Sequence, residues 1–173
     1  MLRFVGTLVD GHPVDEIELR ALMPEDADAA RALVVARLAG TRYEARALEQ
    51  LDVALSFEDP EYLALLAAEP HSSHVVGLAL FGAVAGAQRV TKLHVLLGDD
   101  AGTMDALASA VRAVAEDSGE RMVVAEVPDD APFHDAPDVL RGNGFHEEGR
   151  VDDLVADGVG LRLLVWRKHE RSM

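Results

Sequence analysis

The sequence predicts a mixed α+β sandwich, a fold in which helices cover a central sheet. Two patterns predict it: strand-like apolar runs alternate with segments of helical periodicity, and the last third ends in a short helix followed by a closing hairpin. The 173 residues, of which 49% are hydrophobic, hold no linker-like stretch. We therefore expect one domain over residues 1–173 with a substantial core.

The N-terminal region reads as two strands, over residues 3–9 and 17–21, joined by the turn signal at residues 10–13. Residues 1–14 stand outside the rest of the pattern. They form either an edge strand of the sheet or an arm that reaches a second subunit, and the sequence leaves both open.

Three helices are predicted next. The first begins at Pro24-Glu25-Asp26, where proline and two acids suit a helix N-terminus, and it ends at Gly40. A second follows because apolar residues recur at helical spacing. A third, short helix is predicted over residues 60–68. The apolar residues that define the first two helices are Ala27, Ala30, Val34 and Leu38, then Tyr43, Ala47, Leu51 and Leu55.

The middle of the chain reads as two strands and the clearest helix. Residues 74–84 are nearly continuous apolar sequence, as in a strand covered on both faces. Residues 88–97 alternate, which predicts Leu93, Val95 and Leu97 on one face and Lys92 and His94 on the other. A helix then runs to Gly119, with a buried stripe of Met104, Leu107, Ala108, Val111 and Ala115.

The remaining elements are a strand, an acidic loop, a short helix and a hairpin. We expect the strand over residues 122–127, the loop over 128–138 and the helix over 136–141. The hairpin strands are expected over residues 149–155 and 161–167, with a turn at Asp157-Gly158.

Composition narrows the classes of function. The formal charge of −15 disfavours nucleic acid and anionic membranes as partners and fits an amine better, although acidic composition also arises from solubility alone. The absence of cysteine excludes disulfides, thiolate metal ligands and cysteine nucleophiles. No apolar run approaches roughly 18 residues, and residues 1–4 lack a signal-peptide core, so we expect a cytoplasmic protein.

The order of elements from Ile17 to Lys168 resembles the GNAT N-acetyltransferase superfamily. The resemblance rests on the strand, glycine loop and helix around Gly102, on Gly142-Asn143-Gly144-Phe145, and on the strands that end at Trp166-Arg167-Lys168. It implies a GNAT-like mixed central β-sheet flanked by helices. It also implies acetyl-CoA as co-substrate, an amine of a small molecule or peptide as acceptor, and the homodimer common among relatives.

The resemblance places the cofactor on backbone amides near Val95, Leu97, Gly102, Thr103 and Met104, where a helix N-terminus attracts phosphate. Gly102 aligns with the first essential glycine of the family. Met104 stands where the family has glycine or alanine.

Asp99 of the same loop stands where the family has glutamine or arginine. A carboxylate about 6 Å from a phosphate is repelled by roughly 3 kcal/mol at an effective dielectric constant of about 20. Alternatively, Asp99 or Asp100 caps the helix itself.

Catalytic candidates lie on the two strands that diverge around the acetyl group in this family. His94 is the first candidate for a general base and Glu126 the second, because a histidine pKa near 6.5 suits removal of a proton near neutral pH. His94 as a structural residue and Glu126 as a solvent-facing one stay open. The family tyrosine that protonates the thiolate is replaced by Leu140, which has no proton to donate.

Phe133 and His134 of the acidic loop are candidates for the acceptor pocket, with a role as loop anchors as the alternative. His134 also lies near enough in sequence to be considered as a base. His71 and His74 have no third ligand nearby, so we expect no metal site.

Two hypotheses follow. The first is an acyl-CoA-dependent N-acetyltransferase in which positioning supplies most of the rate. The second is a catalytically inactive, GNAT-shaped ligand-binding or protein-interaction module that has lost CoA binding, motivated by Asp99, Asp100, Met104 and Leu140.

Overall fold

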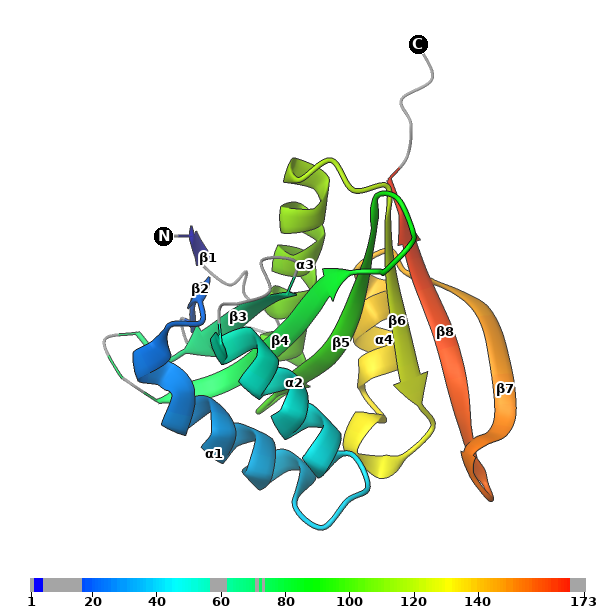
Figure 1. Ribbon diagram of the computed structural model, residues 1–173, viewed down its shortest axis with the longest axis horizontal. Helices are drawn as coiled ribbons and strands as arrows, with labels where there is room; N and C mark the ends of the chain where they lie inside the picture. The colour runs from blue at the N-terminus through cyan, green and yellow to red at the C-terminus, as the bar shows by residue number, and fades with distance from the viewer. Residues whose placement is uncertain (1, 5–16, 57–61, 71, 73, 169–173) are drawn as a thin grey trace, which may run out of the picture.

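The computed structural model describes residues 2–4, 17–56, 62–70, 72 and 74–168. Within them, eight strands form one sheet in the order β1-β2-β3-β4-β5-β6-β8-β7 (Figure 1). All neighbouring strands are antiparallel except β5 and β6, which are parallel. The strands are β1 (Leu2–Phe4), β2 (Ile17–Ala21), β3 (Tyr62–Ala68), β4 (Val75–Ala83), β5 (Val90–Gly98), β6 (Met122–Pro128), β7 (His146–Ala156) and β8 (Val159–Arg167).

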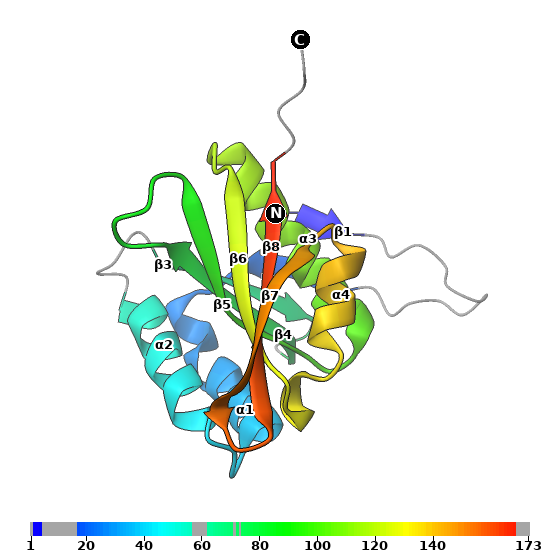
Figure 2. The same cartoon turned by 90° about the vertical axis from the view of Figure 1, so that its right-hand side faces the viewer.

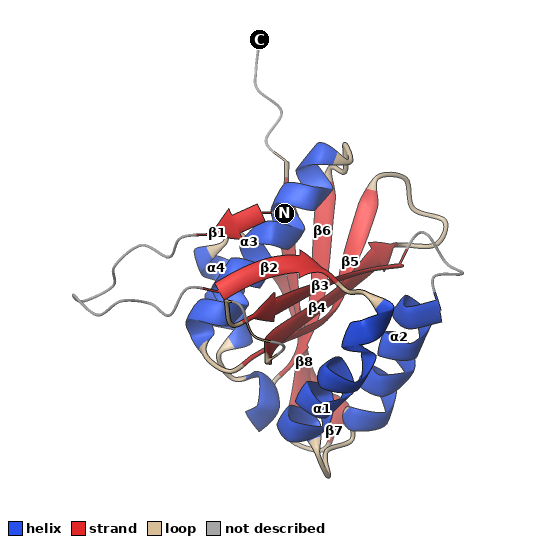
Figure 3. Ribbon diagram, turned by 90° about the vertical axis from the view of Figure 1, so that its left-hand side faces the viewer, coloured by secondary structure: helices blue, strands red, loops and turns tan. Residues whose placement is uncertain are grey.

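Helices cover both faces of this sheet (Figure 3). They are the 3-10 turn η1 (Pro24–Asp26), α1 (Ala27–Leu38), α2 (Glu44–Ser56), α3 (Ala101–Asp117), the 3-10 turn η2 (Ala131–Phe133) and α4 (Ala136–Gly142). α1 and α2 bury Leu38 and Leu51 with Val95 and Leu97 of β5 on one face. α3 and α4 bury Leu107, Leu140 and their neighbours on the other. The chain is thus a three-layer α/β/α sandwich, which confirms the predicted fold class.

The N-terminal strand is present and pairs antiparallel with β2, with Leu2 opposite Leu19 and Phe4 opposite Ile17. β1 is therefore the edge strand at one end of the sheet. The predicted remainder of this hairpin, residues 5–16, lies outside the described residues.

The first helix begins as predicted, with η1 leading into α1. Asp26 is 7% exposed, and its carboxylate accepts from both terminal nitrogens of Arg20, at 2.5 and 2.6 Å, and from the amide of Met23 at 3.0 Å. The hydrogen bonds from Arg20 hold the pKa of this carboxyl below its usual value. The pair therefore fixes α1 against the end of β2.

The helix predicted over residues 60–68 is wrong in the described part, because Tyr62–Ala68 is strand β3. Its Leu and Ala residues favour helix locally. β3 instead pairs with β2 on one side and β4 on the other, which satisfies its backbone groups. Tertiary pairing overrides the local preference here.

The two later helices are followed by glycines, and the end of α3 agrees with the prediction at Gly119. Gly119 (φ 79°) follows α3, and Gly144 (φ 80°) follows α4, where the amide of Phe145 donates to the carbonyl of Leu140. Phe145 is 2% exposed, so the Gly-Phe pair is a turn and a buried anchor.

The hairpin of β7 and β8 closes the sheet at its other edge (Figure 2). Its β7 strand begins at His146, three residues before the predicted start. No described helix combines the length and apolar character needed to cross a bilayer.

Candidate functional site

The parallel strands β5 and β6 pair only over their first halves. Their register runs from Val90 opposite Met122 to Leu93 opposite Ala125, and no pairing between them follows (Figure 1). β6 continues along β8, whereas β5 continues along β4. The second half of β5 therefore has a free edge toward β6, with backbone groups that could pair with an extended ligand.

A β-bulge lies where the strands separate. Leu80 of β4 is opposite Val95, and the next residue, Phe81, is opposite Leu93, so His94 has no partner on β4. A bulge bends its strand and increases the local twist. The bulge at His94 thus turns β5 away from β6.

The bulge also corrects the predicted faces of β5. Leu93 belongs to the core under α3, whereas Val95 and Leu97 belong to the core under α1 and α2, so these three residues do not share a face. A bulged residue adds one position to the strand and breaks its alternation. His94 and Val95 consequently follow each other on the side of α1 and α2.

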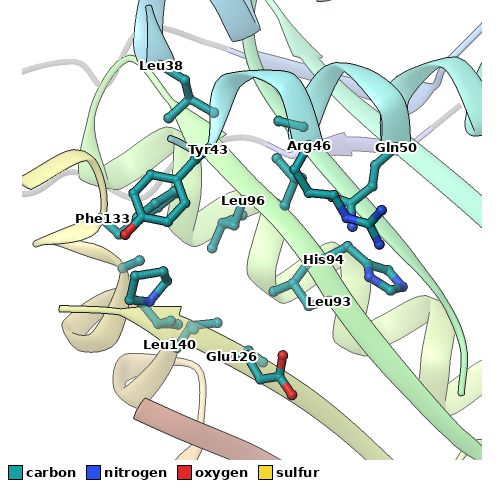
Figure 4. Close-up of a pocket in the computed structure, with 16 residues that line it drawn as sticks. Leu38, Tyr43, Arg46, Gln50, Leu93, His94, Leu96, Glu126, Phe133 and Leu140 are labelled. Carbon is teal, nitrogen blue, oxygen red and sulfur yellow. The ribbon is translucent and has the colours of Figure 1, made fainter. Parts of the chain in front are cut away.

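A cavity of about 130 Å³ opens between the diverging strands (Figure 4). Its lining comes from both sides of the sheet: Leu38, Tyr43, Arg46, Ala47 and Gln50 from the α1–α2 side, Leu93 to Leu96 from β5, Ala125 to Pro128 from β6, and Phe133, Ala136 and Leu140 from the α4 side. We call this space the cleft. Its lining therefore joins residues from both faces of the sheet.

His94 lines the cleft and stacks on Tyr62, with ring centroids 4.9 Å apart. Burial lowers the pKa of His94 to about 4, and the charges of Lys92 and Arg46 lower it further than Glu126 raises it. The imidazole is therefore neutral at neutral pH. It can accept a proton there, but it is a weaker base than an ordinary histidine.

Glu126 lines the same cleft from β6, so the structure brings the two catalytic candidates together. Its carboxylate accepts from Lys92 Nζ at 2.6 Å. The side chain of Glu126 is 44% exposed, so solvent reaches this ion pair. The carboxylate is thus shared with a cation of the neighbouring strand.

The structure separates the two acceptor-pocket candidates. Phe133 lines the cleft and packs its ring edge against Tyr43, with centroids 4.9 Å apart. His134 is absent from that lining and pairs with Asp135 at 2.9 Å, with its side chain 75% exposed. Of these two candidates, Phe133 is therefore the one that lines the cleft together with His94 and Glu126.

Three residues that the sequence interpretation did not assign to the site line the cleft as well: Tyr43, Arg46 and Gln50. The Tyr43 hydroxyl donates to Asp130 at 3.1 Å, and burial raises its pKa to about 12. The helical spacing of Tyr43, Ala47 and Leu51 was interpreted as a core face only. Arg46 and Gln50 lie four residues apart, beside that face of the helix. Their spacing is the signal in the sequence that could have indicated a polar wall of the cleft.

The N-terminus of α3 satisfies part of its own hydrogen bonding. Asp100 is the N-cap, and its carboxylate accepts from the amide of Thr103 at 2.7 Å, which confirms the capping alternative. Asp99 forms an ion pair with Arg37 of α1. Within the described residues, no acceptor contacts the first-turn amides of Ala101 and Gly102.

The side chains around these amides are closely packed. Thr103 is 5% exposed, and the Met104 side chain lies so close to Gly98 that a Cβ there would meet it at 2.8 Å. Val95 and Leu97 are 7% and 3% exposed. The amides of Thr103 and Met104 already donate to the carboxylate and the carbonyl of Asp100, so the prediction that these two amides hold the cofactor is wrong. Of the four positions, Val95 and Leu97 keep a backbone edge toward β6.

Leu140 of α4 is 1% exposed and lines the cleft with its apolar side chain. It replaces the tyrosine that the family resemblance would place here. Among the described cleft residues, Tyr43 is the hydroxyl-bearing one, and it stands on the α2 side. The α4 side of the cleft thus carries no proton donor.

The sequence matches no protein-family profile and no curated protein. Solved structures do match. A protein described as a GNAT-family acetyltransferase from Desulfovibrio desulfuricans is 18% identical with a TM-score of 0.74, over 87% of this chain and 98% of that one. The aminoglycoside 6'-N-acetyltransferase from Enterococcus faecium is 12% identical with a TM-score of 0.73, over 90% and 99%.

A third similar structure contains the expected co-substrate. It is a protein from Salmonella typhimurium described as an acetyltransferase with its cofactor acetyl-CoA, 15% identical with a TM-score of 0.70, over 91% of this chain and 96% of that one. At such identities the likeness establishes the architecture and leaves the chemistry to the residues. This chain has the fold of the GNAT acetyltransferases.

Proposed function

We propose that this protein transfers an acyl group from an acyl-CoA thioester, with acetyl-CoA as the simplest donor, to the amine of a small molecule or peptide. The observation that carries the proposal is the cleft between β5 and β6, which crosses the sheet beside the free edge of β5. The similar structures are described as acetyltransferases, and one of them acts on an aminoglycoside amine.

The residues present fit an acyl-CoA in two places. The free edge of β5 from Val95 to Gly98 offers backbone donors and acceptors to an extended amide-bearing arm. The first-turn amides of Ala101 and Gly102 remain for a phosphate at the positive end of α3. Arg37 neutralises part of the charge that Asp99 brings to this end.

A bound acyl-CoA would supply the activated acyl group as a thioester. The chain would orient the acceptor amine against that carbonyl from the α2 side, so that the C–N bond forms as the C–S bond breaks. His94, neutral at neutral pH, or Glu126 would accept the proton that the amine loses. The thiolate can leave without a dedicated acid, since thiols ionise near pH 8.5.

Positioning would supply most of the rate, because an oriented pair of reactants gains roughly 7 to 11 kcal/mol over free encounter. Tyr43 and Phe133 would form one wall of the acceptor side, held by the hydrogen bond from Tyr43 to Asp130. The apolar wall with Leu140 would exclude water from the thioester.

Calorimetric titration with acetyl-CoA tests this proposal, followed by a thiol-release assay with a panel of amines. Binding in the micromolar range and amine-dependent release of CoA are the expected results. No heat of binding at millimolar acetyl-CoA would contradict the proposal.

The cap at α3 favours a second candidate, a GNAT-shaped binding module without CoA. Asp100 occupies the amide of Thr103, and Asp99 adds a second carboxylate. The double variant Asp99→Arg with Asp100→Gly separates the candidates. If the wild-type protein does not bind CoA and the double variant does, the binding module is favoured. If both bind CoA with similar affinity, the enzyme is favoured.

A further inference from the structure

We propose that the acceptor is an amine that also carries an anionic group, such as a carboxylate or a phosphate, and that amines with several positive charges are disfavoured. This inference rests on the proposed function, because it describes the acceptor side of the same cleft. It follows from the charged groups around His94.

Two cations flank His94 on the α2 side. Arg46 lines the cleft from the first turn of α2, and Figure 4 shows it with Gln50 and His94 at one end of the cleft. Lys92 precedes His94 by two residues on β5 and reaches Glu126 across the strands. The acceptor side is therefore bordered by cations, although the whole chain carries a net charge of −15.

Both cations can exchange their present partners for a ligand. Arg46 pairs with Glu49 at 2.7 Å one helical turn away, and both side chains are more than 60% exposed. Lys92 and Glu126 are 30% and 44% exposed. Exposed pairs of this kind contribute little to stability, so replacing them costs little.

A ligand with one ammonium and one anionic group replaces the Lys92–Glu126 pair without leaving an unpaired charge. Its ammonium can form an ion pair with Glu126, and its anionic group can form one with Lys92 or Arg46. Arginine in particular binds carboxylate and phosphate with two parallel hydrogen bonds. A ligand with several ammonium groups would place the additional charges beside Lys92 and Arg46.

The state of His94 supports a positive local potential. The charges of Lys92 and Arg46 both lower the pKa of His94, and the opposing effect of Glu126 is smaller. The distant acids of the chain act more weakly here, because salt screens exposed charges over about 8 Å.

A competition among four acceptors tests this inference, with the full chain and acetyl-CoA. L-Glutamate is the acceptor with a carboxylate and phosphoethanolamine the acceptor with a phosphate. Spermidine and kanamycin are the two polycations. We expect kcat/KM to be at least about tenfold higher for one of the two anionic amines than for either polycation. The anionic amine with the higher kcat/KM shows whether the site prefers a carboxylate or a phosphate.

Charge removal then locates the effect. Arg46→Gln combined with Lys92→Gln should reduce the preference for the anionic amine by about tenfold, whereas Arg31→Gln should preserve it. Arg31 is a control for loss of a cation because it pairs with Asp52 of α2 at 2.8 Å and does not line the cleft. A preference for polycations, or equal preference in the double variant, would overturn the inference.

A binding readout separates this inference from the proposed function. Chemical-shift titration of the His94 imidazole with L-glutamate, phosphoethanolamine and spermidine requires no turnover. Shifts produced by an anionic amine and lost in the double variant support the inference even if no acyl transfer occurs. If neither anionic amine shifts the His94 signals, the inference is wrong, whatever the outcome with acetyl-CoA.

Discussion

The β5 edge of the cleft and the N-terminus of α3 lie within ten residues of each other in the chain, yet they differ in which backbone groups they leave without a hydrogen-bond partner. The cleft has a free strand edge and an apolar cavity. The N-terminus of α3 has a capped amide and two carboxylates, one of them paired with Arg37. One region is open to a ligand, and the other is partly closed by the protein itself.

The difference follows from what builds each region. The cleft depends on sheet topology and on one bulge, which many side-chain sequences can support. An anion site at α3 depends on which side chains stand beside its first turn, and there the Asp100 carboxylate occupies one amide while Asp99 pairs with Arg37. The first region is thus defined by the backbone, and the second by its side chains.

Filling the cleft should have the largest effect. Ala136 is 3% exposed and lines the cleft at the start of α4, so Ala136→Phe would occupy much of its volume of about 130 Å³. We expect kcat/KM with acetyl-CoA to fall about 100-fold, equivalent to about 2.7 kcal/mol.

Overpacking also destabilises proteins, so a thermal melt must accompany the kinetics. Val53→Phe, at a 39% exposed position of α2, is the control for added bulk. Unchanged turnover by folded Ala136→Phe protein would show that the thioester reacts elsewhere.

The pH dependence of His94 gives the next largest effect. With a pKa near 4, its imidazole stays neutral above that pH, so the acid limb of kcat/KM should lie near pH 4 and not near 6.5. His94→Gln should lower kcat/KM roughly tenfold and remove this limb. A limb that persists in the variant would assign the proton to Glu126 or another group.

The same pKa has a consequence for stability. Unfolded histidine binds a proton below about pH 6.5, whereas folded His94 resists it until about pH 4. The free energy of unfolding should therefore decrease as pH falls from 6.5 to 4, and His94→Gln should reduce this decrease. Thermal melts across this range measure it, and equal slopes in both proteins would refute the lowered pKa.

Removing the hydroxyl of Tyr43 should have a smaller effect. Tyr43→Phe keeps the ring contact with Phe133 and deletes the hydrogen bond to Asp130. We expect KM for the acceptor to rise about fivefold, since such a bond contributes about 1 kcal/mol, with KM for acetyl-CoA unchanged. A rise in the KM for acetyl-CoA alone would show that Tyr43 acts on the cofactor side of the cleft and not on the acceptor side.

The cap of α3 should affect turnover least. Asp100→Ala removes the acceptor for Thr103 and should lower the free energy of unfolding by about 1 kcal/mol, while Asp100→Ser keeps a cap and should lower it less. Turnover should change no more than about twofold, since the cleft is untouched. Chemical denaturation and the thiol-release assay measure the two quantities, and a large loss of turnover in Asp100→Ser would give Asp100 a role beyond capping.

Most of the elements were predictable because their signals are local. Pro24 and Gly119 mark helix limits, and the apolar stripe of α3 repeats at helical spacing. Strand β3 was not predictable in this way, because its Leu- and Ala-rich sequence favours helix until β2 and β4 pair with it. Strand pairing is a long-range interaction that no local window contains.

The site was predictable in part. His94 and Glu126 were expected together because neighbouring strands carry them, and the cleft brings them together. Arg46 was missed because a helix several elements earlier supplies it. The bulge at His94 was missed because it depends on the register with β4, which the alternation of β5 does not reveal.

By itself, the sequence determined the layered fold, the order of its elements and the identity of the groups able to carry charge, because periodicity, capping and turn chemistry act between near neighbours. The tertiary structure alone decided which faces those groups share. It set a bulge beside a diverging strand, paired Asp99 with Arg37, and placed Arg46 and Lys92 around a neutral histidine. Such arrangements depend on contacts between residues distant in the chain, so they exist only once the sheet has formed.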